Sequence, residues 1–381
     1  MFFSEFGRYN ESDGLDTLEG FVDYSKKKGF DTQKEYLASM EAVETVLERE
    51  SGLVELPHPD VPTIIIPDLH ARKEFLAQVL ATKIGEETVF DRLVSNKVNI
   101  VCLGDAMHSE DPNRWTAESA PFRLNEVLLE VSKQDTRNYI VQFKRLLELE
   151  LPGIPYEQMT EQNIRTAFMS PDVIKYFKTL RQLVEDDMLI QDTAQSLGMM
   201  RMIMDLKTLC PESFHFVRGN HDDVDGYVAK FNHESERTAL AIADKFGEGF
   251  LRLLANFQAE LPLVVKGKNF VASHAMPGRI LTRDEIEERS KHATEALTAT
   301  DNVSANVRKP SPECLLDTMA NIGAGEGGKW IVGHRRVNGT DGYREQYDGK
   351  LVQICDPVNK IIAVVSPNKP FIPKEQVKIL R

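Results

Sequence analysis

The chain has 381 residues, enough for one large core and an accessory unit. Its 59 acidic residues outnumber the 46 lysines and arginines, and the formal net charge of -13 argues against broad binding to nucleic acids or anionic membranes, which depends on basic surfaces. The first residues lack the basic and apolar regions of a signal peptide, and the four cysteines lack CxxC spacing. We therefore expect a cytoplasmic protein with reduced cysteines.

Residues 1–60 are expected to form an N-terminal helical lead-in, with a helix over about 31–49 that ends before a cluster of prolines. The apolar run at 64–66 predicts a strand, and residues 72–83 predict a helix that crosses to a second strand at 99–103. This order is typical of a βαβ unit with a right-handed crossover.

The interval between the second and third strands is much longer than a crossover requires, since a dozen or more residues suffice. Residues 116–210 are therefore expected to be an insertion, and apolar residues at spacings of three and four predict that it is helical. Its methionine-rich end, 197–209, is typical of a helix core, and a promiscuous binding surface is the alternative. Because the insertion leaves the sheet just after Asp105, we expect a cap over the site that sets substrate choice.

The remainder of the chain alternates between helical and strand patterns. Residues 235–257 predict another helix, and residues 263–272 predict a hairpin. A loop and helix segment follows over 277–328, and its glycine-rich end lacks the Lys-Ser/Thr pair of a phosphate-binding P-loop. Residues 344–366 predict a second hairpin and a last strand.

Short polar clusters follow the apolar runs throughout the chain. They are PDLH at 67–70, GDAMH at 104–108, GNHD at 219–222, SHA at 273–275 and GHR at 333–335. In open α/β sheets the ligand site lies at the carboxyl ends of the strands, so we expect these clusters to lie close together. Each residue alone would more often be a turn acid or a satisfied histidine, but the joint pattern indicates a site for two metal ions. The candidate metal ligands are Asp68, His70, Asp105, Asn220, His274 and His334.

Carboxylate, amide and imidazole ligands without thiolates suit Mn, Fe, Zn or Co and argue against a structural zinc site. Asp68 and His70 are two residues apart, so on an extended strand end they point to the same side and are suited to one ion. Asp105 follows a glycine that permits a sharp turn and is the natural bridging ligand. His221, beside a ligand, is the candidate general acid that protonates the leaving oxygen.

The order DxH, GD, GNH followed by an acid, H, and GH resembles the calcineurin-like metallophosphoesterase superfamily. The resemblance implies an α/β fold, a four-layer α-β-β-α sandwich of mixed sheets with the helical insertion as a cap. It places the core at 61–115 and 211–381, with 1–60 and 116–210 outside the core. It also implies that Asp68 and His70 hold the first of two divalent ions and that Asp105 bridges. Asn220, His274 and His334 would hold the second.

Two departures from the superfamily pattern stand out. Many members close with GHxH, but here Arg335 and Arg336 follow His334, as in the serine/threonine protein phosphatase branch, which lacks the second histidine. That branch also has an acid three residues after GD that orients the catalytic histidine, whereas this chain has His108 there. The residue that orients His221 is open, and the candidates are Glu110, Asp111 and Asp222.

The resemblance implies hydrolysis of a phosphomonoester, on a phosphoprotein or a small metabolite, by attack of a metal-bound hydroxide. A nucleotide phosphodiesterase or a dinucleoside-polyphosphate hydrolase is the alternative enzyme, and a catalytically impaired metal-binding interaction protein is the alternative of another class. His108 and Arg335 are candidates for phosphate binding, with structural roles as the alternative. The remaining histidines are expected to be structural: His58, His215, His233 and His292.

Overall fold

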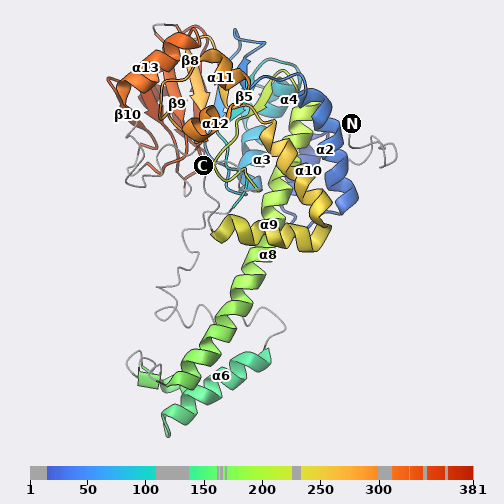
Figure 1. Ribbon diagram of the computed structural model, residues 1–381, viewed down its shortest axis with the longest axis vertical. Helices are drawn as coiled ribbons and strands as arrows, with labels where there is room; N and C mark the ends of the chain where they lie inside the picture. The colour runs from blue at the N-terminus through green and yellow to red at the C-terminus, as the bar shows by residue number, and fades with distance from the viewer. Residues whose placement is uncertain are drawn as a thin grey trace. The chain divides into compact units, whose positions relative to one another are not determined.

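The computed structural model describes residues 15–108, 137–160, 163, 166–167, 170–224, 233–298, 311–325, 327–337, 341–356 and 359–380 (Figure 1). The chain forms two compact units. The larger unit comprises Met1–Pro112 and Asp192–Arg381, and the smaller unit comprises Asn113–Gln191. The chain thus leaves the larger unit after Pro112 and returns to it at Asp192.

The larger unit contains two mixed sheets. The first has the strand order β13-β12-β2-β5-β6, in which β2, β5 and β6 are parallel neighbours. Its strands are β2 (Thr63–Ile66), β5 (Asn99–Cys102), β6 (Phe214–Phe216), β12 (Ile361–Val365) and β13 (Val377–Ile379). β12 is antiparallel to both β2 and β13.

The second sheet has the order β1-β7-β8-β9-β11-β10, and β8, β9 and β11 are parallel neighbours. Its strands are β1 (Leu53–Glu55), β7 (Val264–Lys266), β8 (Phe270–Ser273), β9 (Lys329–Val332), β10 (Arg344–Gln346) and β11 (Leu351–Gln353). The expected hairpins are confirmed, because β7 pairs with β8 and β10 pairs with β11 in antiparallel register. β1 was not expected and extends the sheet by pairing in parallel with β7.

Alternate residues of the strands enter different apolar cores, as a two-residue side-chain period requires. Ile64 and Ile66 pack in a core with helices, whereas Ile65 packs in a core that contains residues of both sheets. In the second sheet Val271 packs with helical residues, and Ala272 joins the core shared by the sheets. Burial on both faces explains the continuous apolar runs of the strands. The mixed α/β class is confirmed, and the order of four layers stays a prediction.

The helices of the larger unit pack mainly in two of these cores. Those that supply apolar residues to the first sheet's core are α1 (Leu18–Ser25), α2 (Gln33–Leu47), α3 (Lys73–Ala81), α4 (Val89–Val94), α9 (His233–Phe246), α10 (Glu248–Ala259) and the end of α8 (Pro171–Leu209). Those with residues in the second sheet's helical core are α11 (Arg283–Glu287), α12 (Lys291–Thr298) and α13 (Pro312–Asn321). The short elements β3 (Lys83–Ile84), β4 (Glu87–Thr88) and α14 (Pro373–Gln376) complete the unit.

Two helix predictions differ from the structure. The single helix expected over 235–257 is two helices, α9 and α10, because Gly247 between them has a φ of 88° that interrupts a right-handed helix. The methionine-rich helix expected at 197–209 begins much earlier in the chain, at Pro171, and forms one helix, α8, of 39 residues. The methionine-rich stretch lies in its last turns, and Met199, Met200 and Met202 are fully buried, which confirms the helix-core interpretation.

The smaller unit contains α6 (Arg137–Glu150), a 3₁₀ turn at Tyr156–Gln158 and the first part of α8. Phe143 of α6 is buried and stacks on Tyr176 of α8 with a ring-centroid distance of 6.1 Å. The first part of the expected helical insertion, residues 116–136, lies outside the described residues. In the part of the chain that the structure describes, no helix has the length and apolar character needed to cross a membrane.

Candidate metal centre

The two sheets deliver the candidate ligands from the carboxyl ends of parallel strands. In the first sheet, Asp68 follows β2, Asp105 follows β5 and Asn220 follows β6. In the second sheet, His274 follows β8 and His334 follows β9. The structure thus brings together residues that are up to 266 positions apart in sequence, as the backbone N–H of His334 donates to Asp68 Oδ1 at 3.0 Å.

The carboxylates and imidazoles form two groups suited to a metal ion. Asp68, His70 and Asp105 form one group, and Asp105, His274 and His334 form the other, with the ligand atoms of each group within 4.8 Å of one another. Asp105 belongs to both, as a bridging ligand must. Within the groups, Asp105 Oδ2 lies 3.9 Å from His70 Nε2 and 3.5 Å from His274 Nε2.

The tautomers of the histidines give a test of whether a cation fits. His274 Nδ1 lies 2.7 Å from the carbonyl oxygen of Leu103, which only accepts, so Nδ1 carries a proton. In the neutral ring, Nε2 then presents a lone pair. It faces Asn220 Oδ1 at 2.8 Å and His334 Nδ1 at 2.9 Å. In that neutral form two acceptor atoms, His274 Nε2 and Asn220 Oδ1, face each other beside His334 Nδ1, and a cation between them would resolve the repulsion.

His70 is held in the same way. Its Nδ1 lies 3.0 Å from the carbonyl oxygen of His108, so its Nε2 faces Asp68 and Asp105. Hydrogen bonds of this kind, from the second ring nitrogen to a carbonyl, fix the tautomer and orientation of metal-binding histidines. The residues present fit two divalent ions.

The backbone at the centre adopts conformations that are uncommon outside glycine. His70, Asp105, His108 and His334 have φ values of 44°, 50°, 62° and 66°. Such outliers cluster at functional sites, because surrounding structure must hold them in place. Glycine is required at Gly333, where a Cβ would lie 2.0 Å from Asp68 Oδ1.

Electrostatics at the centre also favour a cation. Burial raises the pKa of Asp68, with His274 opposing the shift and the charge of Asp105 adding to it. For Asp105, burial is outweighed by His274, His221 and His70, which hold the pKa of its carboxyl below the ordinary range. The buried carboxylates of Asp68 and Asp105 repel each other when both are ionised. A divalent ion would stabilise both in the ionised form.

His221 lies beside the centre, and its backbone N–H donates to Asp105 Oδ1 at 2.9 Å. Burial lowers the pKa of His221 to about 4, against an opposite contribution from Asp105. The ring is flanked by two other imidazoles, those of His70 and His108, with ring-centroid distances of 5.7 and 5.3 Å.

Asp222, one candidate to orient His221, instead connects two loops. Its carboxylate accepts from the backbone N–H groups of Asp105, Ala106 and Gly219 at 2.8, 2.9 and 2.9 Å. Burial, followed by the nearby charge of Asp105, raises the pKa of Asp222 to about 6. We assign Asp222 a structural role. The other two candidates, Glu110 and Asp111, lie outside the described residues.

We compared the chain with known proteins. Neither family models nor curated proteins give a match. Among solved structures, a protein serine/threonine phosphatase from Saccharomyces cerevisiae superimposes with a TM-score of 0.52 and 14% identity, over 92% of this chain and 89% of that chain. The chain thus shares its overall fold with this serine/threonine phosphatase.

Two further structures have TM-scores below 0.5. A putative diadenosine tetraphosphatase has a TM-score of 0.38 and 12% identity, over 87% of this chain and 97% of that chain. A cold-active protein-tyrosine phosphatase of Shewanella has a TM-score of 0.41 and 10% identity, over 88% of this chain and 84% of that chain.

Several features of the candidate site were not predicted. The carbonyl oxygens of Leu103 and His108 hold imidazoles, but any residue offers a carbonyl, so sequence carries no signal for them. Asp192 Oδ2 lies 3.6 Å from His108 Nδ1 and comes from a segment that was assigned to the insertion. Arg335, a candidate for phosphate binding, is exposed beside His334, and its role stays a prediction.

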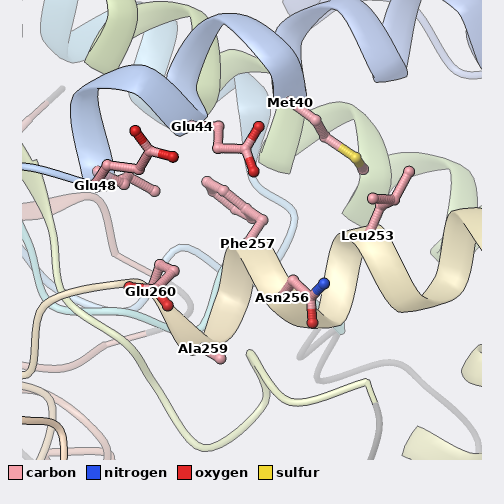
Figure 2. A pocket seen from close by; sticks show the side chains of 9 residues that line it. Met40, Glu44, Glu48, Leu253, Asn256, Phe257, Ala259 and Glu260 are labelled. Carbon is pink, nitrogen blue, oxygen red and sulfur yellow. The ribbon is translucent and has the colours of Figure 1, made fainter. Parts of the chain in front are cut away.

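A separate cavity of about 270 Å³ lies between α2 and α10 (Figure 2). Its lining includes Met40, Leu253 and Phe257 and, at the rim, Glu44, Glu48 and Glu260. None of its lining residues is a candidate metal ligand. Three glutamates would repel a phosphate group. This cavity is therefore a poor candidate for binding a phosphate group.

We expect purified protein to carry up to two transition-metal ions per chain, measured by elemental analysis. Removal of the ions with a chelator should lower the melting temperature by several degrees, and Mn should restore it, because an ion at 100 times its Kd stabilises the fold by about 2.7 kcal/mol. His292→Ala, at an exposed histidine, should keep the metal content. Absence of metal, with no thermal shift from Mn, Fe, Co or Zn, would contradict the ligand assignment.

Proposed function

We propose that the protein is a phosphoesterase that depends on two divalent metal ions and hydrolyses a phosphomonoester, either on a phosphoprotein or in a small metabolite. The observation that carries the proposal is the pair of ligand groups that share Asp105, with His221 directly beside them. The shared fold with a serine/threonine phosphatase supports it.

In this proposal, Asp68, His70 and Asp105 hold one ion. Asp105 holds the other together with Asn220, His274 and His334. When bound, the ions would supply Lewis acidity for water activation and for the phosphate oxygens. Mn, Fe, Zn and Co all suit these ligands, and we propose Mn as the first ion to test.

The residues of the chain hold and protonate the substrate. We propose that Arg335, exposed beside His334, binds phosphate oxygens, because a guanidinium matches them bidentately. His221 would donate a proton to the leaving oxygen from its protonated form, which the negative charge of a bound phosphate would favour. Its backbone hydrogen bond to Asp105 ties the proton donor to the proposed bridging ligand. The proton donor and the metal ligands are thereby held at fixed positions relative to one another, as catalysis by proximity and orientation requires.

The test compares an aryl monophosphate with a bis-aryl phosphate, each with Mn present. Faster turnover of the monoester is the expected result, and faster turnover of the diester would instead identify a phosphodiesterase. Arg335→Ala should raise KM for the monoester. Absence of turnover in protein that carries two ions would identify a metal-binding interaction protein.

We also propose that the protein works in the cytoplasm. Its four cysteines all lie in the described part of the chain, and none of them forms a disulfide. Proteins of oxidising compartments commonly use cysteines in disulfides, so four cysteines without a disulfide favour a reducing compartment.

We expect the smaller unit to determine substrate choice. The chain departs for this unit shortly after His108 and returns at Asp192, and these two residues lie side by side in the larger unit. Replacing Asn113–Gln191 with a short linker should broaden the use of small substrates and slow the native reaction. The measurement is kcat/KM on an aryl phosphate, a sugar phosphate and a phosphopeptide. Unchanged relative rates in a folded variant would remove the unit from the mechanism.

A further inference from the structure

His108 occupies the position at which the protein phosphatase branch has its acid, three residues after Asp105. The structure places the His108 ring against the ring of His221, with 5.3 Å between centroids and an interplanar angle of 65°. An imidazole thus occupies the place where an acid would be expected. An edge-to-face contact of this kind fixes how one ring lies against the other.

The backbone of His108 is held at both of its polar groups. Its N–H donates to Ser196 Oγ at 3.0 Å, and its carbonyl oxygen accepts from His70 Nδ1 at 3.0 Å. Its φ of 62° lies in the left-handed region, and only 4% of the residue is exposed. The position of the His108 ring is therefore determined by the surrounding structure and not by solvent.

The carboxylate of Asp192 lies next to the His108 ring. Asp192 Oδ2 is 3.6 Å from His108 Nδ1, and Thr238 Oγ1 is 3.5 Å from the same nitrogen. Asp192 is 8% exposed, so its charge is weakly screened by water. A carboxylate beside Nδ1 favours the tautomer with the proton on that nitrogen.

We propose that Asp192 and His108 are positioning residues for His221 and together replace the single acid of the protein phosphatase branch. Asp192 orients the His108 ring, and the His108 ring holds the His221 ring in the orientation that serves the leaving oxygen. The inference rests on the proposed function, because it assigns the partners of the proposed general acid. Of the earlier candidates, Asp222 accepts three backbone hydrogen bonds, and the other two lie outside the described residues.

The first test is Asp192→Asn, which keeps the side-chain shape and removes the charge. We expect unchanged metal content, melting temperature and KM, with kcat on an alkyl phosphate lower by about 10-fold to 10²-fold, since small displacements of catalytic groups cost this much. The loss should be smaller on an activated aryl phosphate, which hardly needs the proton. Asp172→Asn, at an exposed position of the same helix, is the control. Equal losses on both substrates would overturn the inference.

The second test restores a carboxylate next to His221. In His108→Asp the new side chain tolerates the left-handed backbone, because aspartate visits that region more readily than most residues. Asp192→Asn should then cause no further loss of kcat and should raise it, because two adjacent buried carboxylates repel each other. A full loss from Asp192→Asn in this background would overturn the inference. If Asp192→Asn alone fails to fold, the activity of His108→Asp on the alkyl phosphate is the test. Retained activity would support the inference, and lost activity in a folded variant would overturn it.

A third readout needs no turnover. Selective ¹⁵N labelling of histidine reports the tautomer of each imidazole by NMR, and His108→Gln assigns its resonance. We expect the proton on Nδ1 of His108 in the wild-type protein and a changed tautomer population in Asp192→Asn, together with a shift of the His221 resonances. Unchanged His221 resonances would overturn the inference. Failure of the wild-type protein to hydrolyse any phosphate ester would count against the proposed function alone.

Discussion

Replacing Asp105 with asparagine should remove metal and activity together. The variant keeps the size of the side chain but loses the charge that both ligand groups share. Charge stabilisation by bound metal ions is worth several kcal/mol in a transition state, and about 4 kcal/mol corresponds to roughly 10³-fold in rate. We therefore expect kcat to fall by about 10³-fold or more, with less than one ion bound per chain.

Metal content and kcat are measured on the same sample of Asp105→Asn. Asp60→Asn serves as the control, because Asp60 contacts Lys268 at 2.7 Å on the surface and is not in either ligand group. Circular dichroism should show that both variants are folded. Retention of two ions by Asp105→Asn would show that Asp105 is not the bridging ligand.

His221→Ala should behave differently from Asp105→Asn, because it should lower kcat and leave the metal content unchanged. His221 contributes no atom to either group of candidate ligands. A general acid contributes on the order of 10² to 10⁴ in rate, so we expect kcat on an alkyl phosphate to fall by about that factor. The loss should shrink on an aryl phosphate, because an oxygen of low pKa leaves without protonation.

The decisive measurement for His221→Ala is the ratio of kcat values on the alkyl and aryl substrates, with His292→Ala as the control. A ratio equal to that of the wild-type protein would mean that His221 is not the proton donor. Loss of metal from the variant would instead make His221 a ligand or a support for one.

Much of the fold was predictable, because the strands that precede the candidate ligands are short apolar runs that end in recognisable motifs; they are β2, β5, β6, β8 and β9. Asp68, Asp105 and Asn220 could be assigned to strand ends because a strand places its next polar residue at the sheet edge. Helix boundaries were harder to predict. Gly247 separates two helices within one apolar pattern, and periodicity alone does not detect such a break.

The surroundings of His221 could not be predicted, because they depend on tertiary contacts without local signals. His108 and Asp192 are separated by the entire smaller unit, yet their side chains lie 3.6 Å apart. Asp222 follows His221 directly, but its carboxylate turns to backbone N–H groups of another loop. Proximity in sequence was a poor guide in both cases.

The division of the ligands between two sheets has a consequence for the order of events during synthesis and folding. The chain provides Asp68 early, but His334 emerges from the ribosome 266 residues later. Bringing residues so far apart in sequence together is slow, since the chain loses conformational entropy before the stabilising contacts form. A nascent chain therefore lacks the complete centre until β9 has joined its sheet. Uptake of both ions would therefore follow the synthesis of β9.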